Sequence, residues 1–559
     1  MTRLSRRDIF KIAVAGGVVP ASRAVAAQSR PAAGPSRKDR PNILFIMADQ
    51  HRADCVGASG NAAIRTPTLD WIAREGARFS NAYSSTPSCI PARAALLTGL
   101  TPWHHGWLGM GEWPSAAKYP FEMPRAFREA GYYTASIGKN HFYPSARDRF
   151  YLPLVSHGYD FMLQDEHHDY PLLYRTDYHS WFWSNAPEIY AGDGYLNDVP
   201  DGCGFGWKNF WNAWQASPYP YPERLHRARW VGETAVRFLR NYNRPQPLFL
   251  KVSFIPPHPP YVPPARLMQP YLESALPQAI HDGWDDRYRP TSGHGLEMCW
   301  HEGLSADQVH GSRAGYYGQV TFVDEQVGHL LEELDARGWL EETLIFYCSD
   351  HGDMLGDHGR WTKAQPYQSA VRIPMLMRWP RGLVSAARGQ VLSQTAEERD
   401  VLPTFLGAAS IPAPEHLDGR SLLALASGRA DGWRLYIDLE HDISWCGPTV
   451  HWNALTDGHT KYIFHTWDGS EQLFDLDGDP HELHDLASDS GHESQLRLWR
   501  RRMVAHLAER GDAWVKNGKL VVGRPRIPIS PNYPRAEAKQ IVIMPRDSAP
   551  AGSTAELRE

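Results

Sequence analysis

The stretch Asn42-Ile43-Leu44-Phe45-Ile46-Met47-Ala48-Asp49 is an unbroken apolar run that ends in an acidic residue. Such a run suits a strand buried on both faces of a parallel sheet, because helices cover both faces of that kind of sheet. Similar apolar runs occur at residues 133–138, 248–254, 344–350 and 373–379. The chain therefore contains several strands of one buried sheet.

Helical patterns lie between these runs, at residues 68–75, 124–130, 223–241 and 305–337. In the last of them, apolar side chains recur every three or four residues, as on the buried face of a helix. Helices that alternate with apolar strands predict an α/β fold. We expect a large, mostly parallel (mixed) sheet flanked by helices.

The pattern changes after about residue 425. Residues 452–466 alternate like strands at the edge of a sheet, and residues 495–510 are typical of a basic helix. We predict a large domain over residues 41–425, a smaller C-terminal α+β subdomain over 426–515, and a tail over 516–559. The tail is rich in proline, and we expect it either to wrap over the surface or to be disordered.

The first 28 residues contain the three parts of a cleavable export signal, in order. The pair Arg6-Arg7 precedes an apolar segment, Ile12–Pro20, and the small residues Ala24-Val25-Ala26. The pair resembles the twin-arginine type of signal peptide, which implies the twin-arginine translocase as a partner. We predict an exported protein, periplasmic or secreted, and no other run of the sequence is apolar enough to predict a transmembrane segment.

Composition narrows the classes of function. The 559 residues carry a net charge of -5, so the chain lacks the basic excess that nucleic-acid binding needs. Its six cysteines do not make a disulfide scaffold, and no C-x-x-C pair suggests structural zinc. Its 21 tryptophans, several of them between residues 181 and 214, fit either an aromatic-lined pocket or a Trp-rich core.

A second stretch carries reactive chemistry: Ser88-Cys89-Ile90-Pro91-Ala92-Arg93-Ala94-Ala95-Leu96-Leu97-Thr98-Gly99. Proline favours the first turn of a helix and glycine its end, so this pattern predicts a helix that starts near Cys89. The free N–H groups at a helix start favour anions, and Arg93 lies about one turn further on. We expect an anion to bind here, beside the atom that attacks it.

Polar residues follow the predicted strands, at the edge where an open α/β sheet binds its ligands. One set offers carboxylate, amide and imidazole ligands that suit Ca²⁺ or Mg²⁺, with Mn²⁺ also possible. It comprises Asp49, Gln50, Asp350 and His351. A second set offers cations or donors that suit an oxyanion ester, sulfate or phosphate. It comprises Arg93, Lys139, His258 and Lys363.

The run Cys89-Ile90-Pro91-Ala92-Arg93, followed by Leu97-Thr98-Gly99, resembles the modification sequence of the type I sulfatases, a family of the alkaline phosphatase-like superfamily. Further blocks are similar to that family in the same order. They are residues 42–50, Gly138-Lys139-Asn140-His141, Pro257-His258, Ser349-Asp350-His351-Gly352-Asp353 through Lys363, and residues 460–480. The resemblance covers roughly residues 41–490 and implies the hydrolysis of an aryl, carbohydrate or small-alcohol sulfate ester.

The resemblance also implies roles for the residues. In this family the cysteine is converted to formylglycine (3-oxoalanine) by a formylglycine-generating enzyme, and one hydroxyl of its hydrate attacks sulfur. The implied ligands of one divalent cation, Ca²⁺ foremost, are Asp49, Gln50, Cys89, Asp350 and His351. The implied catalytic set is Cys89, Arg93, Lys139, His141, His258 and Lys363.

Within that set, Arg93 and Lys139 would support the hydrate and His141 would take the proton of its second hydroxyl, which expels sulfate. The sulfate oxygens would be bound by Lys139, His258 and Lys363. Either His258 or Lys363 would protonate the leaving alcohol or phenol.

Gln50 and His351 depart from a common pattern of the family, in which Asp and Asn stand at these positions. Both exchanges resemble a subgroup that includes choline sulfatases, iduronate-type sulfatases and phosphonate monoester hydrolases, and they favour Mn²⁺ more than the usual pattern does. One alternative function is therefore that of a phosphonate monoester hydrolase or phosphodiesterase of the same superfamily. An alternative of another class is an unmodified sulfoglycan-binding pseudoenzyme.

Two other clusters are interpreted as structural. We expect Asp165-Glu166-His167-His168-Asp169 to be a solvated loop rather than a second metal site. We expect His104-His105 to have a structural role.

Overall fold

The computed structural model describes residues 40–110, 119–141, 156–166, 176–187, 213–289, 303–442 and 450–534. The export signal predicted over residues 1–28 lies outside them, and so do Trp207, Trp211, His167, His168 and Asp169. Within the described ranges, no helix has the length and apolar character needed to cross a membrane.

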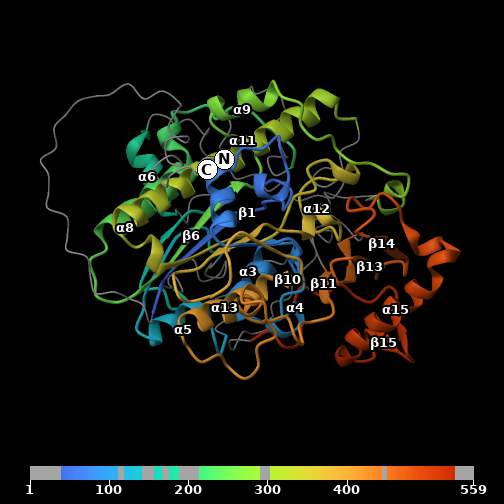
Figure 1. Cartoon of the computed structure of the whole chain (residues 1–559). Helices are drawn as coiled ribbons and strands as arrows, with labels where there is room; N and C mark the ends of the chain where they lie inside the picture. The colour runs from blue at the N-terminus through green and yellow to red at the C-terminus, as the bar shows by residue number, and fades with distance from the viewer. Residues whose placement is uncertain are drawn as a thin grey trace, which may run out of the picture.

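An eight-stranded sheet runs through the centre of the molecule in the order β5-β4-β6-β1-β7-β8-β2-β9 (Figure 1). Its strands are β1 (Asn42–Asp49), β2 (Ala77–Phe79), β4 (Tyr133–Gly138), β5 (Phe161–Gln164), β6 (Leu248–Pro257), β7 (Thr343–Ser349), β8 (Met375–Arg378) and β9 (Gln390–Leu392). Of these strands, β8 alone runs against the others. The prediction of a mixed, mostly parallel sheet is confirmed.

Helices cover both faces of this sheet, as the apolar runs predict (Figure 1). The main helices are α2 (Pro67–Arg74), α3 (Cys89–Thr98), α4 (Pro102–His105), α5 (Met123–Glu129), α6 (Asp177–Asn185), α8 (Arg227–Asn241), α9 (Ala265–Leu272), α11 (Ala306–Ala336), α12 (Gln368–Val371), α13 (Val401–Ala408), α14 (Leu422–Ala426) and α15 (Glu493–Leu507). Side chains alternate between the two faces along β1. Leu44 and Ile46 pack with α8 and α11, whereas Ile43 and Phe45 pack with α5 and α13.

Helix α11 is the long helix that the sequence predicts. It starts with a capping box, in which the Ser305 side chain accepts from the Gln308 backbone and Gln308 reaches back to the Ser305 N–H. Such a box satisfies two of the N–H groups that the start of a helix leaves unpaired. This cap places the beginning of α11 within one residue of the predicted start.

A four-stranded antiparallel sheet follows the large domain, in the order β11-β12-β13-β14. Its strands are β11 (Ile437–His441), β12 (Trp452–Thr456), β13 (Thr460–His465) and β14 (Glu471–Asp475). The expectation of an edge-like pattern in this region is wrong for β12, which lies between β11 and β13 and is buried throughout. Its polar side chains are buried because they find partners: Asn453 bonds to Glu440, and Thr456 to the Thr460 carbonyl. Polar residues in this strand therefore do not mark a solvent-facing side.

The start of the predicted tail runs over the surface near α4. Ile529 forms a β-bridge with Trp107, and the Ser530 N–H donates to the Gly106 carbonyl. The ring of Tyr533 packs edge-on against Trp107 with centroids 5.0 Å apart. Up to residue 534 the tail thus wraps over the surface, which is the first of the two predicted alternatives. Residues 535–559 lie outside the described part.

Asp324 connects two helices on one face of the large sheet. From α11, its buried carboxylate accepts the backbone N–H groups of Thr68 and Leu69, at 3.1 and 2.8 Å. These groups lie in the first turn of α2, where N–H groups have no partner within the helix. Burial raises the pKa of Asp324 to about 7.

We predict that Asp324→Asn changes how stability depends on pH. An aspartate whose native pKa is about 7 rather than 3.8 binds a proton more tightly in the native than in the unfolded state. Between those values it lowers the free energy of unfolding by on the order of 1 kcal/mol per pH unit as pH rises. In urea denaturation from pH 4 to 8, the free energy of unfolding of the variant minus that of the parent should increase with pH up to about pH 7. A difference that does not vary with pH would contradict the raised pKa.

Candidate active site

Cys89 is the first residue of α3 and is wholly buried. The residue before it, Ser88, is extended, and the helix ends at Gly99 in the left-handed conformation. The helix start predicted near Cys89 is therefore confirmed. The Ser88 hydroxyl makes a 2.7 Å hydrogen bond with Nε2 of His441, a residue of the C-terminal sheet.

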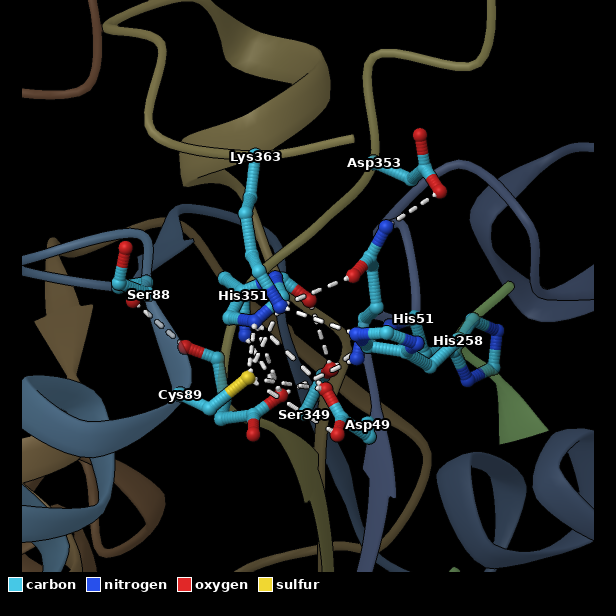
Figure 2. A network of polar contacts seen from close by, with 12 residues as sticks. Asp49, His51, Ser88, Cys89, His258, Ser349, His351, Asp353 and Lys363 are labelled. Atoms are coloured by element: carbon cyan, nitrogen blue, oxygen red, sulfur yellow. Dashed lines mark hydrogen bonds and ion pairs between the residues drawn. The ribbon is translucent and has the colours of Figure 1, made fainter. Parts of the chain in front are cut away.

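The Cys89 sulfur lies among charged side chains from several strand ends (Figure 2). Nζ of Lys363 is 3.0 Å from Sγ, and Nζ of Lys139 is 3.6 Å from it. Nε2 of His351 is 3.2 Å away and Oδ1 of Asp49 is 3.6 Å away. Residues far apart in the chain thus meet at the helix start, as the parallel topology predicts.

The electrostatics of the site favour an anion at the Cys89 side chain. Burial and the Asp49 carboxylate raise the pKa of the thiol, but Lys139, Lys363 and His351 outweigh them, so the net pKa is lowered. The pKa of Lys363 is raised: burial lowers it, and the negative charges of Cys89 and Asp49 more than compensate. Buried cations directed at one point stabilise negative charge there, as on a bound oxyanion.

Four side chains form a compact set of possible metal ligands. The ligand atoms of Asp49, Cys89, Asp350 and His351 all lie within 4.8 Å of one another, and all four residues are buried. The Nδ1 of His351 is 2.9 Å from the Gly352 carbonyl, so Nδ1 donates and Nε2 is directed to the cluster. Two carboxylates and one imidazole fit a hard divalent cation.

The pKa of His351 agrees with this interpretation. Burial lowers the pKa, but the negative charges of Asp350 and Cys89 together raise it more, and the net pKa lies above the ordinary value. The same negative charge that stabilises a proton on the imidazole would stabilise a divalent cation in its place.

The Gln50 side chain lies at the rim of this cluster. Its Oε1 accepts from Nζ of Lys363 at 3.3 Å, and its Nε2 donates to Oδ2 of Asp353 at 2.7 Å. Its backbone N–H donates to Oδ1 of Asp350 at 3.1 Å. The amide oxygen therefore faces the side of the site where Cys89 and Lys363 lie.

Arg93 makes its contacts with Asp350 rather than directly with Cys89. Its Nε and one terminal nitrogen lie 2.9 and 2.8 Å from the same oxygen of Asp350. Its other terminal nitrogen donates to the Lys139 carbonyl at 2.8 Å and to the Ser253 hydroxyl at 3.2 Å. Arg93 thus compensates the charge of Asp350 and ties α3 to the ends of β4 and β6.

The turn from Lys139 to His141 is held by an acidic side chain. Oε1 of Glu166 accepts the backbone N–H groups of Asn140 and His141 at 2.8 and 2.9 Å. His141 has a positive φ of 60°, which an ordinary residue adopts only when its surroundings hold it there. Glu166 therefore helps to hold the turn that carries Lys139 and His141.

The expectation that the acidic cluster after β5 is a solvated loop is wrong for its first two residues. Asp165 and Glu166 are wholly buried, because β5 pairs in parallel with β4 and so ends beside the Lys139 turn. Burial raises the pKa of Glu166. The apolar segment Phe161–Gln164 that ends in two acids repeats the pattern of the other strands, and that signal could have revealed the site.

His258 and Lys363 face each other across the site. The Nε2 of His258 is 3.1 Å from Nζ of Lys363, and its Nδ1 is 2.8 Å from the Pro259 carbonyl. Burial, followed by the charge of Lys363, lowers the pKa of His258 well below its ordinary value. A neutral imidazole therefore accepts a hydrogen bond from a charged ammonium.

His105 is buried, and His104 pairs with Asp418 at 2.7 Å, which agrees with a structural role. Among the described tryptophans of residues 181–214, Trp214 packs in a core cluster and Trp181 against one, while Trp183 is 45% exposed. For Trp181 and Trp214 the interpretation as part of a Trp-rich core is sufficient.

Family models match most of this chain. The Sulfatase model matches residues 41–411, and the model for the C-terminal part of N-sulphoglucosamine sulphohydrolase matches residues 356–509. This chain belongs to the sulfatase family. It is a sulfuric ester hydrolase with the sulfatase fold, as the motifs around Cys89 predict.

Individual relatives agree with that assignment. The chain is 33% identical to an arylsulfatase of Clostridium perfringens over 490 residues, which are 87% of this chain and 98% of the relative. It is 29% identical to a choline-sulfatase of Rhizobium meliloti, over 80% of this chain and 82% of the relative. In structure it is similar to a phosphonate monoester hydrolase of Agrobacterium radiobacter, with a TM-score of 0.69, 24% identity, and coverage of 84% and 96% of the two chains.

We predict that Arg93→Ala lowers the free energy of unfolding by about 3–5 kcal/mol, because it leaves the buried Asp350 carboxylate without its compensating charge. Arg266→Ala is the matched control. Arg266 is also ion-paired, with the carboxylates of Glu223 and Glu325, but its side chain is 48% exposed. Its loss should cost at most about 1 kcal/mol. Urea denaturation of both variants checks this, and equal losses would contradict the role given to Arg93.

Proposed function

We propose that this sulfatase hydrolyses its sulfate ester through a formylglycine formed from Cys89, with the help of one divalent cation. The observation that carries the proposal is the surroundings of Sγ. Two lysine ammonium groups, one imidazole and one carboxylate lie within 3.6 Å of it, at the start of a buried helix. The positive charges of this set already favour an anion at residue 89, and the same charges would stabilise a sulfate ester attacked at this point.

The cation would be held by Asp49, Asp350, His351 and residue 89, with Oε1 of Gln50 as a further oxygen ligand. We propose Ca²⁺ first, and Mn²⁺ or Mg²⁺ as alternatives, because oxygen ligands outnumber nitrogen ligands in this set. When bound, the cation supplies positive charge that lowers the pKa of the attacking hydroxyl and polarises the sulfate.

The protein's own side chains would bind the sulfate and move the protons. Lys139, Lys363 and His258 would contact sulfate oxygens, and Arg93 would keep Asp350 and the Lys139 turn in place. The charged Lys363 donates to the neutral His258, so a proton can reach the leaving oxygen from Nζ directly or through Nε2. The pKa of His141 lies well below its ordinary value because of burial and the charge of Lys139, which makes it a neutral base for the second hydroxyl.

The substrate class and the cellular context belong to the same proposal. An aryl, small-alcohol or carbohydrate sulfate is supported by relatives named arylsulfatase and choline-sulfatase. We propose that a formylglycine-generating enzyme modifies Cys89 and that residues 1–28 direct export through the twin-arginine translocase. We also propose the domain boundaries given above, with the catalytic domain at residues 41–425.

The alternative of a phosphonate monoester hydrolase or phosphodiesterase has a specific observation in its favour. A phosphonate monoester hydrolase shares the fold with a TM-score of 0.69. We rank it second, because the relative that is 33% identical to this chain, and that aligns with it over 98% of its own length, is an arylsulfatase.

We predict that the purified enzyme prefers 4-nitrophenyl sulfate to bis(4-nitrophenyl) phosphate by at least tenfold in kcat/KM, a difference of about 1.4 kcal/mol in transition-state binding. Both substrates release 4-nitrophenol, so one absorbance assay compares them. The control is the Cys89→Ala variant. Its hydrolysis of both substrates should fall to the rate measured without enzyme. A preference for the diester would replace the proposed function with the phosphodiesterase alternative.

We predict that the peptide containing Cys89 is lighter than its sequence mass by about 18 Da, since the CH₂–SH side chain becomes an aldehyde. Mass spectrometry of a proteolytic digest, after alkylation of free thiols, checks this. Cys348 is also buried but is not followed by the Pro and Arg that follow Cys89, so its peptide is the internal control and should carry the alkyl group. An alkylated Cys89 in protein from the native host would favour the sulfoglycan-binding pseudoenzyme.

A further inference from the structure

Asp353 lies just outside the proposed metal cluster, in the loop that follows β7 (Figure 2). It is wholly buried and accepts four hydrogen bonds from three parts of the chain. The donors to Oδ2 are Nε2 of Gln50 at 2.7 Å and the Tyr261 hydroxyl at 2.6 Å. The donors to Oδ1 are the backbone N–H groups of Leu355 at 2.8 Å and Thr362 at 3.1 Å.

Each of these contacts lies close in sequence to a residue of the proposed active site. Tyr261 is three residues after His258, and Thr362 directly precedes Lys363. Gln50 contacts Asp353 itself. His258, Lys363 and Gln50 also lie in a chain of contacts of 3.1 and 3.3 Å. One carboxylate is therefore bonded to all three segments that supply this side of the site.

The chemistry of Asp353 also decides which way the Gln50 amide points. Each oxygen of the carboxylate already accepts a hydrogen bond from a backbone N–H or a hydroxyl, so the carboxylate presents only acceptors to Gln50. The NH₂ of the amide must then face Asp353, and the oxygen must face Lys363 and the metal cluster. An amide turned the other way would direct two N–H groups at the cation and at the Lys363 ammonium.

We propose that Asp353 is a positioning residue. It keeps Oε1 of Gln50 directed at the cation as a ligand, and it holds the loops that carry His258 and Lys363 in place. The inference rests on the proposed function, in which a divalent cation binds beside residue 89. It extends that function to a group that touches neither the cation nor the substrate. Support of this kind for a metal ligand is worth 10–100-fold in metal affinity.

The proposal is tested with Asp353→Asn, in which an amide replaces the carboxylate with almost no change in size. The new NH₂ group faces Gln50, whose own amide must turn and present its NH₂ to the cluster. We expect the affinity for Ca²⁺ and Mn²⁺, measured by titration calorimetry on protein stripped with a chelator, to fall 10–100-fold. The kcat/KM for 4-nitrophenyl sulfate at subsaturating metal should fall with it.

A second change separates this role from simple structural support. In Gln50→Glu combined with Asp353→Asn, the glutamate accepts from the asparagine NH₂ and directs its other oxygen at the cluster. The double variant should recover metal affinity to within about threefold of the parent, because an acceptor again faces the cation. If Asp353 served the fold alone and did not orient residue 50, the double variant would bind the cation no better than Asp353→Asn.

The matched control is Asp324→Asn, which also converts a buried aspartate that accepts backbone N–H groups but lies between α2 and α11. It should leave metal affinity unchanged. Parent-like metal affinity of D353N, or a double variant no better than D353N, would overturn the inference. If D353N does not fold, a double variant that folds and binds the cation supports it, and failure of both to fold would overturn it. A parent protein that binds no divalent cation would instead refute the proposed function.

Discussion

The ion pair between Arg93 and Asp350 is the interaction on which the rest of this site depends. Asp350 is wholly buried at the end of β7, where an uncompensated carboxylate would be very costly. The guanidinium that compensates it comes from α3 and also donates to the Lys139 carbonyl after β4 and to Ser253 on β6. Since Cys89 lies one turn before Arg93 on the same helix, this pair sets where Cys89 stands relative to the strand ends.

The site around that pair is a cluster of opposite charges on buried side chains. Lys139 forms an ion pair with Asp49, and Lys363 lies against the Cys89 sulfur. In such surroundings charges act strongly on one another, which explains why the pKa of Cys89 is lowered although burial raises it. Charges held in this way need little rearrangement when negative charge develops on a bound ester.

Support for the site comes from elements that do not carry the reactive groups. Glu166 at the end of β5 holds the Lys139 turn, and Asp353 holds the Gln50 amide. His441 reaches the residue before Cys89 from β11 of the small sheet. Because of this contact, the C-terminal sheet is part of the architecture of the site rather than an appendage to it.

The sequence by itself determined the strands that carry the site and most of the residues that meet there. A strand buried in a parallel sheet is mostly apolar, and ligands bind beyond its carboxyl end. The polar residues at the ends of these runs, Asp49, Lys139, His258 and Asp350, could therefore be predicted from local pattern alone. The helix start at Cys89 was equally local, because proline and glycine mark the two ends of a helix.

Only the tertiary structure decided which of these groups touch and what supports them. The antiparallel direction of β8 and the burial of Glu166 follow from which strands become neighbours, and pairing between distant segments leaves no local signal. The same holds for Arg93, whose partner lies 257 residues away, and for Asp353, whose partner Gln50 lies 303 residues away. A hydrogen bond depends on position and direction in space, and the spacing of residues along one chain does not contain that information.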